Sequence, residues 1–123
     1  MMLDAGALIA IGKNDRRMIA RLLAASEEEE ELRSHPMVVA QAWRDGRRQA
    51  LLARLLRGVA IVPLDDDLGR RAGELLGKAR MSDPIDAAVV LIAQDGEAVV
   101  TSDAEDIQHL ARVAKRRLVI VAC

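Results

Sequence analysis

Residues 81–106 read MSDPIDAAVVLIAQDGEAVVTSDAED, and this stretch holds four carboxylates in two similar settings. It joins an apolar run with helical character to a short apolar strand, Ala98–Val100, which leads directly into another helical run. Acidic residues border both elements: Asp83 and Asp86 at the first helical run, Asp103 and Asp106 after the strand. Pro84 stands where a helix tolerates a residue without an N–H group, so the first helix is expected to begin there.

The order of strand, acid and helix predicts where these carboxylates lie. A strand that runs straight into a helix leaves the junction at the carboxyl end of the sheet, where open α/β sheets bind ligands. Asp103 occupies such a junction. Asp4 follows Met1–Leu3 and precedes the apolar run Ala5–Ile11, so the same order occurs at the start of the chain.

Length and composition predict one globular domain over residues 1–123. Apolar residues make up 51% and charged residues 30% of the chain, so disorder is excluded. Trp43 is the only aromatic residue, which argues against a single-strand binder that stacks bases on aromatic side chains. The net charge of -1 gives no general affinity for nucleic acids.

Localisation is predicted from what the sequence lacks. Cys123 is the only cysteine, so no internal disulfide can form and a reducing compartment fits. No apolar run is long enough to cross a membrane, and the first residues do not have the pattern of a signal peptide. We therefore expect a cytoplasmic protein without a membrane partner.

The remaining pattern alternates between strands and helices. Four strands are expected, at Met1–Asp4, Val59–Val62, Ala98–Val100 and Leu118–Val121. Helices are expected at Ala5–Ile11, Arg16–Ala25, from about Met37, at Arg47–Arg57, from Asp65–Asp67 to Arg80, and around Glu105–Ala114. Residues 32–42 have a mixed pattern. Strands with helical crossovers predict a parallel sheet with helices on both faces.

Two interpretations of the acids remain open at this point. Asp83 and Asp103 could simply cap helices, and Asp86 and Asp106 could stabilise the first turn through the helix dipole. Asp4, Asp86 and Asp103 are nevertheless expected to meet at one edge of one sheet. Clustered carboxylates repel one another unless a cation lies among them, and oxygen ligands favour Mg²⁺ or Mn²⁺. No His/Cys cluster suited to zinc is present.

Four segments together carry a resemblance that covers nearly the whole chain: LDAGALIA, VVAQAWRDGRRQALLARLL, SDPIDAAVVLIA and VVTSDAEDI. They resemble the corresponding blocks of PIN-domain ribonucleases, specifically VapC-type toxins of bacterial type II toxin–antitoxin modules. The resemblance implies a three-layer α/β/α sandwich with a central, mainly parallel sheet of four to five strands. It also implies a metal-dependent endoribonuclease that hydrolyses RNA phosphodiester bonds with Mg²⁺ or Mn²⁺.

Residue by residue, the resemblance assigns catalysis and metal binding to Asp4, Asp86 and Asp103. Asp106 matches an additional acid found one turn later, so whether it is a ligand or a helix cap stays open. Gln41 stands where the family usually has a glutamate. An amide oxygen can ligate a metal directly or hold a metal-bound water, but it carries no charge, so a second metal is in question.

The other expected contacts concern substrate and partners. Arg44, Arg47 and Arg48 are candidates for RNA phosphates, because guanidinium groups match phosphate geometry, although arginine-rich helices are more often solvated. Thr101 and Ser102 are expected to supply hydrogen bonds that orient Asp103. The family resemblance further implies a cognate antitoxin protein and a homodimer.

Two alternative functions are weighed against a nuclease. A phosphoacceptor receiver domain requires an aspartate at the end of its third strand and a late lysine, whereas Val59–Val62 is followed by Pro63 and Leu64. A catalytically weak PIN fold that binds another protein is the stronger alternative, and Gln41 is its motive.

Overall fold

The computed structural model describes residues 1–123 as alternating strands and helices. The strands are β1 (Met2–Leu3), β2 (Leu32–Ser34), β3 (Val59–Ile61), β4 (Ala98–Thr101) and β5 (Val119–Ala122). The helices are α1 (Ala5–Gly12), α2 (Arg16–Glu27), α3 (Pro36–Ala42), α4 (Ala50–Leu56), α5 (Asp66–Ala79), α6 (Pro84–Ile92) and α7 (Ala104–Val113). No helix is both long enough and apolar enough to cross a membrane.

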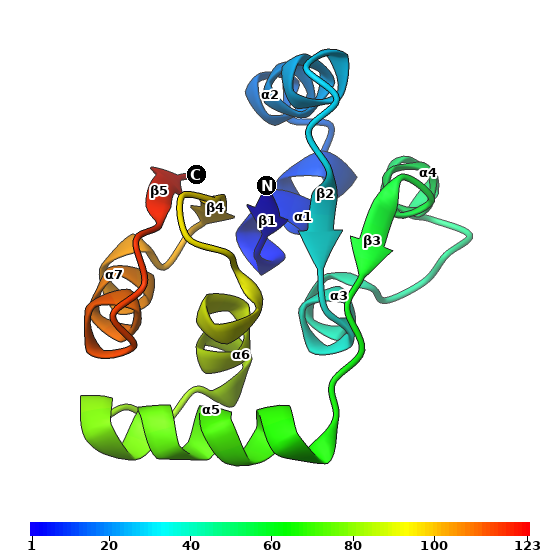
Figure 1. Ribbon diagram of the computed structural model, residues 1–123. Helices are drawn as coiled ribbons and strands as arrows, with labels where there is room; N and C mark the ends of the chain where they lie inside the picture. Colours follow the sequence, from blue (N-terminus) through cyan, green and yellow to red (C-terminus); the bar gives the residue numbers. More distant parts are fainter.

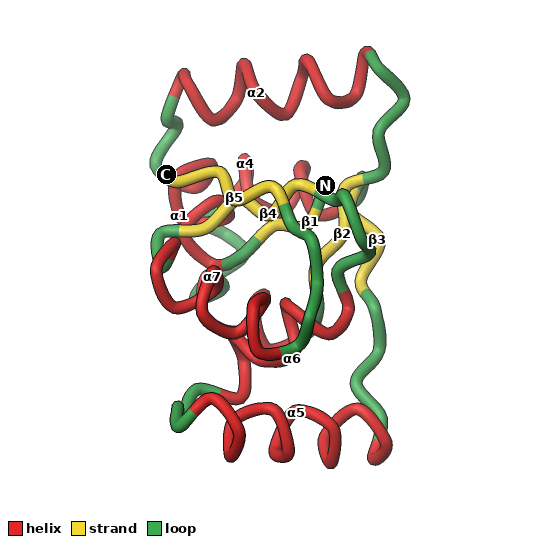
Figure 2. Tube along the Cα trace, turned by 60° about the vertical axis from the view of Figure 1, so that its left-hand side comes forward, coloured by secondary structure: helices red, strands yellow, loops and turns green.

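The strands form one sheet in the order β3-β2-β1-β4-β5, with every neighbouring pair parallel. The chain moves outward from β1 to β3, crosses back to β4, and then continues outward in the other direction. Because parallel crossovers are right-handed, this reversal sends the helices of the two halves to opposite faces. Figure 2 shows α2 and α5 on opposite sides of the sheet. The predicted three-layer α/β/α fold is therefore confirmed.

The reversal places the topological switch point between β1 and β4, which are neighbours in the centre of the sheet (Figure 1). The helices that follow these two strands, α1 and α7, depart to different faces. A crevice is therefore expected outside the carboxyl ends of β1 and β4. Asp4 directly follows β1, and Asp103 is the second residue after β4, immediately before α7.

The core is aliphatic and centres on the same two strands. Met2, Leu3, Val99 and Val100 have no solvent exposure, because helices cover both faces of the central strands. This explains why the strands read as continuous apolar runs without alternation. Burial of such side chains is the main favourable contribution to folding, at roughly 1.5–3 kcal/mol each.

One strand was missed by the sequence analysis. Arg33 interrupts the three-residue strand β2 with a charge, so the segment does not read as a buried strand. In the structure its guanidinium donates a 2.7 Å hydrogen bond to the Glu97 carboxylate, whose side chain is 9% exposed. This pairing spans 64 residues, so no local pattern reveals it.

The predicted helix Arg47–Arg57 was wrong at its beginning, because α4 starts only at Ala50. The Gln49 side chain accepts hydrogen bonds from the backbone N–H groups of Arg44 and Asp45 and donates one to the carbonyl of Ala42. These bonds hold a turn in place of the first helical residues. Arg47 and Arg48 consequently lie in that turn, outside the helix.

Candidate metal centre

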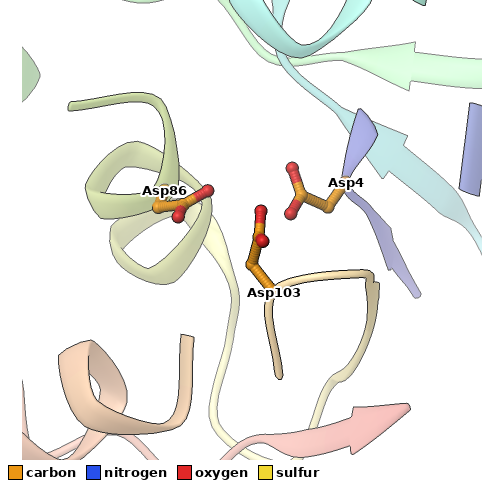
Figure 3. Close-up of side chains that lie close together, drawn as sticks. All are labelled: Asp4, Asp86 and Asp103. Atoms are coloured by element: carbon orange, nitrogen blue, oxygen red, sulfur yellow. The ribbon is translucent and has the colours of Figure 1, made fainter. Parts of the chain in front are cut away.

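Three carboxylates from distant parts of the sequence converge at the switch point. Asp4 follows β1, Asp103 follows β4, and Asp86 lies in the first turn of α6. Each offers an oxygen, and the three oxygens all lie within 4.8 Å of one another. Figure 3 shows the three side chains pointing toward a common centre. The predicted convergence of these acids is therefore present in the structure.

Asp4 is held in place by hydrogen bonds although its side chain is buried, with 2% exposure. One carboxylate oxygen accepts a 2.8 Å bond from the N–H of Ala5, and the other accepts a 2.7 Å bond from the Thr101 hydroxyl. The same hydroxyl accepts a 2.9 Å bond from the backbone N–H of Asp103. Thr101 thus connects two of the three acids, acting on the backbone of Asp103 and on the carboxylate of Asp4.

Asp86 is almost as buried, with 4% exposure, but no protein group donates a hydrogen bond to its carboxylate. Burial raises its pKa to about 7, and repulsion from Asp4, Asp83 and Asp103 contributes further. A buried carboxylate without donors is costly in its ionised form. The protein therefore provides no partner for the ionised Asp86 carboxylate.

Asp83 and Asp103 both occupy N-cap positions, yet only one of them caps. The Asp83 carboxylate accepts hydrogen bonds from the N–H groups of Ile85 and Asp86, which confirms the capping interpretation for this residue. The Asp103 side chain makes no capping hydrogen bond. Partial burial, followed by repulsion from Asp4 and Asp106, raises the pKa of Asp103. Its carboxylate is thus directed at the cluster without a protein partner.

The donor set fits a hard divalent cation. All three groups are carboxylates, and none of the ion pairs in the structure includes one of them. Oxygen donors of this kind suit Mg²⁺ or Mn²⁺, which accept carboxylates and retain several waters. A cation would offset the repulsion that raises the pKa values of Asp86 and Asp103.

Sequence comparison assigns this arrangement to a known family. The PIN domain family profile matches residues 1–115, which include all three acids. The chain belongs to the PIN domain family. Among solved structures, it is similar to a chain in the crystal structure of VapBC2 from Rickettsia felis bound to a DNA fragment from their promoter. That similarity has a TM-score of 0.67 at 16% identity and covers 97% of this chain and 96% of that chain. No curated protein matches the sequence.

The other predicted site residues of this PIN domain lie at the surface. Gln41 is exposed in the last turn of α3, and Asp106 is exposed in the first turn of α7. Ser102 is exposed beside Asp103, with its side chain packed close to Gly6.

The three predicted arginines are exposed as well. The Arg44 guanidinium donates to the carbonyls of Ala40 and Trp43, and Arg48 lies 3.8 Å from Asp45. Arg47 has its backbone N–H bonded to the Asp45 carboxylate. These contacts leave the guanidinium groups at the surface of the turn before α4.

One residue beside the site was not anticipated from the sequence. His35 is fully buried at the N-cap of α3, where its Nδ1 accepts from the N–H groups of Met37 and Val38. Its Nε2 donates to the carbonyl of Ile85, which precedes Asp86. Burial lowers the pKa of His35 and outweighs the opposing effects of Ile85 and Asp4, so the ring is neutral. His35 thereby ties α3 to the start of α6.

Proposed function

We propose that this PIN domain is a metal-dependent endoribonuclease of the VapC type, the toxin component of a type II toxin–antitoxin system. The observation that carries the proposal is the convergence of Asp4, Asp86 and Asp103 without a neutralising side chain. Membership of the PIN family and the similarity to a VapBC2 structure support it. A cytoplasmic location goes with this function, since its substrate would be cellular RNA.

The three acids have different roles in this proposal. Asp86 and Asp103, which have no protein partners, would be ligands of Mg²⁺ or Mn²⁺, and Asp4 would present the oxygen that Thr101 orients. A bound cation would polarise the scissile phosphate and lower the pKa of the attacking water. Asp106 and Gln41 are further candidates at the rim, directly or through water. Ser102 remains a candidate for orienting Asp103.

Substrate binding is assigned to the turn before α4. Arg44, Arg47 and Arg48 are exposed there and would hold RNA phosphates that flank the cleaved bond. Exposed guanidinium groups remain partly hydrated when they bind a phosphate, so the free-energy cost of desolvation is small. Replacing Arg47 with Gln should raise KM for RNA more than it lowers kcat.

The deciding experiment measures metal binding and RNA cleavage together. Calorimetric titration with Mn²⁺ should show binding that Asp103→Asn weakens strongly, whereas Asp95→Asn, on the loop before β4, should leave it unchanged. A fluorescently labelled RNA should be cleaved with Mg²⁺ or Mn²⁺ and remain intact with EDTA. A DNA of the same sequence serves as the substrate control. Metal binding that persists in Asp103→Asn would reject this site.

A protein partner is part of the proposal, because a free ribonuclease would damage its own cell. An apolar groove of about 330 Å³ between α2 and α4 is lined by Leu22, Leu23, Leu51 and Leu55, and Leu23 is 59% exposed. Exposed apolar patches of this kind commonly mark protein interfaces. We assign this groove to an apolar segment of the antitoxin.

Copurification from cells that express the neighbouring gene tests this assignment. Leu23→Glu should break the complex, whereas Val119→Glu, at an exposed apolar side chain on β5, should not. If the protein elutes alone and is harmless when expressed, the toxin function is rejected. Light scattering of the purified chain would test the expected homodimer.

The alternative function is a catalytically weak PIN fold that serves as a protein-binding module. Gln41 favours it, since an uncharged amide stands where relatives of this type usually carry a glutamate. Full metal binding with no cleavage of any RNA would support this alternative over the nuclease.

A further inference from the structure

A second, positively charged groove lies away from the acidic cluster. It has a volume of about 410 Å³, and its lining residues lie on α5 from Arg71 onward and at or just beyond the ends of α6 and α7. Four basic residues line it, Arg71, Lys78, Lys115 and Arg116, together with one acid, Glu74, and four apolar residues between them. The chain as a whole has a net charge of -1, so this concentration of positive charge is local.

The basic groups are largely available to a ligand. Lys78 and Lys115 are exposed and take part in none of the ion pairs. Arg71 meets Asp67 only in an exposed pair at 3.7 Å, which contributes little. The Arg116 guanidinium donates to the carbonyl of Ala93 at 2.8 Å, which holds it at the groove. The groove therefore combines one guanidinium that is held by a hydrogen bond, Arg116, with two lysines that have no ion-pair partner, Lys78 and Lys115.

Helix stability does not account for this arrangement. Lys78 lies in the last turn of α5, where a cation interacts favourably with the helix dipole. That effect explains a lysine at the end of one helix. It does not explain why the ends of α5 and α7 share a groove with two additional arginines.

The composition of the groove favours a polyanion recognised through its backbone. An apolar partner would not be matched by four cations. No aromatic residue lines the groove, so it offers no aromatic platform on which bases could stack. The ligand groups that match this lining are therefore phosphates, which lysine and arginine bind. Contacts to backbone phosphates do not depend on the base sequence of the nucleic acid.

The distance between the groove and the acidic cluster determines how long an RNA strand must be to reach both. α7 begins after Asp103, and Lys115 follows its last residues, twelve positions further along the chain. At a rise of 1.5 Å per residue this is roughly 18 Å. A nucleic acid strand with about 3.4 Å per nucleotide covers that distance in about five nucleotides.

We propose that this groove binds backbone phosphates of the RNA substrate, about five nucleotides from the bond cleaved at the acidic cluster. The inference rests on the proposed ribonuclease function. It extends the binding surface beyond the turn before α4 and predicts that tight binding needs a strand long enough to reach both places. Arg112 is exposed in the last turn of α7, close in sequence to Lys115 and Arg116.

The test is fluorescence anisotropy with labelled single-stranded RNA of 20 and of 3 nucleotides, in a full-length Asp103→Asn background that prevents cleavage. The double variant Lys78→Gln/Lys115→Gln should bind the long RNA about tenfold more weakly at 0.15 M salt. The slope of log affinity against log salt should fall by about 1.4, or 0.7 for each lost phosphate contact. Lys13→Gln changes the only other lysine of the chain and is the matched control.

The remaining measurements separate the possible failures. The variant Lys78→Arg/Lys115→Arg keeps the charges and should bind the long RNA like the parent protein, which shows that the loss is not one of folding. The 3-nucleotide RNA should bind equally to all variants. Equal affinities of the double variant and Lys13→Gln for the long RNA would overturn the inference, even where the wild-type protein cleaves RNA. A loss seen only with duplex DNA would also overturn it. If the wild-type protein does not cleave RNA at all, the proposed function is rejected, whereas the measured effect of the lysine variants on RNA binding still holds.

Discussion

Replacement of Asp86 by Asn should stabilise the metal-free protein, although it removes a residue of the site. Asp86 is 4% exposed, receives no hydrogen bond from the protein, and has its pKa raised from 3.8 to about 7. The folded state therefore binds more protons than the unfolded state between about pH 4 and pH 7, so stability falls as pH rises through this window. Asparagine has nearly the same shape and no charge, which removes this penalty.

The magnitude follows from the shift. Three pKa units correspond to about 4 kcal/mol well above pH 7. Water at the mouth of the cluster screens part of this, so we expect a gain of about 2 kcal/mol at pH 8. For a domain of this size that is a rise in Tm of roughly 6–10 °C. The gain should shrink as pH falls toward 4, because Asp86 of the wild type then becomes protonated.

The assay is urea and thermal unfolding in EDTA at pH 8 and at pH 5, repeated with Mn²⁺ at pH 8. Metal at a hundred times its Kd should stabilise the wild type by about 2.7 kcal/mol, while the variant should gain little, so the order of the two Tm values reverses. Asp67→Asn, in the exposed first turn of α5, is the control and should change stability by less than about 0.5 kcal/mol. A folded Asp86→Asn protein that is no more stable than the wild type in EDTA at pH 8 would refute the reasoning.

Further predictions concern residues around the cluster. Thr101→Val should cost about 1–3 kcal/mol in urea unfolding, because the buried hydroxyl loses the bond it donates to Asp4 and the bond it accepts from Asp103, and should weaken Mn²⁺ binding about 10-fold or more. Gly6→Ala should destabilise by about 1–3 kcal/mol, since its Cβ would lie 2.8–3.1 Å from three side-chain atoms, whereas Gly77→Ala in open space should stabilise by about 0.5–1 kcal/mol. Gln41→Glu should tighten Mn²⁺ binding and raise ribonuclease activity; unchanged affinity and rate would place this side chain outside the metal site. Because the pKa of His35 is lowered, the folded state resists its protonation, so His35→Asn should abolish a loss of stability that sets in as pH falls below about 6.5; an unaltered pH profile would contradict this.

The positions of the acids could be predicted because their settings are local. Each acid that follows a strand is identified by a short apolar run before it and a helical pattern after it, as at Asp4 and Asp103. Parallel topology then brings such residues to one edge of the sheet without further information. Asp86 could be placed nearby because its helix begins within the same stretch of sequence.

The interactions across the fold could not be predicted in this way. The strand β2 depends on Arg33 and Glu97, which are 64 residues apart and satisfy each other's charge. The sequence around His35 has only a mixed pattern, whereas in the structure the buried ring joins α3 to the carbonyl of Ile85, 50 residues away. In both cases a polar residue in an apolar setting is explained by a partner that only the folded chain provides.

The same limit explains why a capping acid and a site acid look alike in the sequence. Asp83 and Asp103 both precede a helix, and both are followed three residues later by another acid. The structure separates them by their hydrogen bonds: Asp83 accepts from two N–H groups at the start of α6, while Asp103 accepts from none at the start of α7. Because Asp83 satisfies the start of α6, the Asp86 carboxylate does not have to, and it remains directed at the cluster. In this fold a carboxylate that faces other carboxylates and lacks a protein donor, as at Asp86 and Asp103, is therefore a more informative mark of a ligand site than an acid at a strand end.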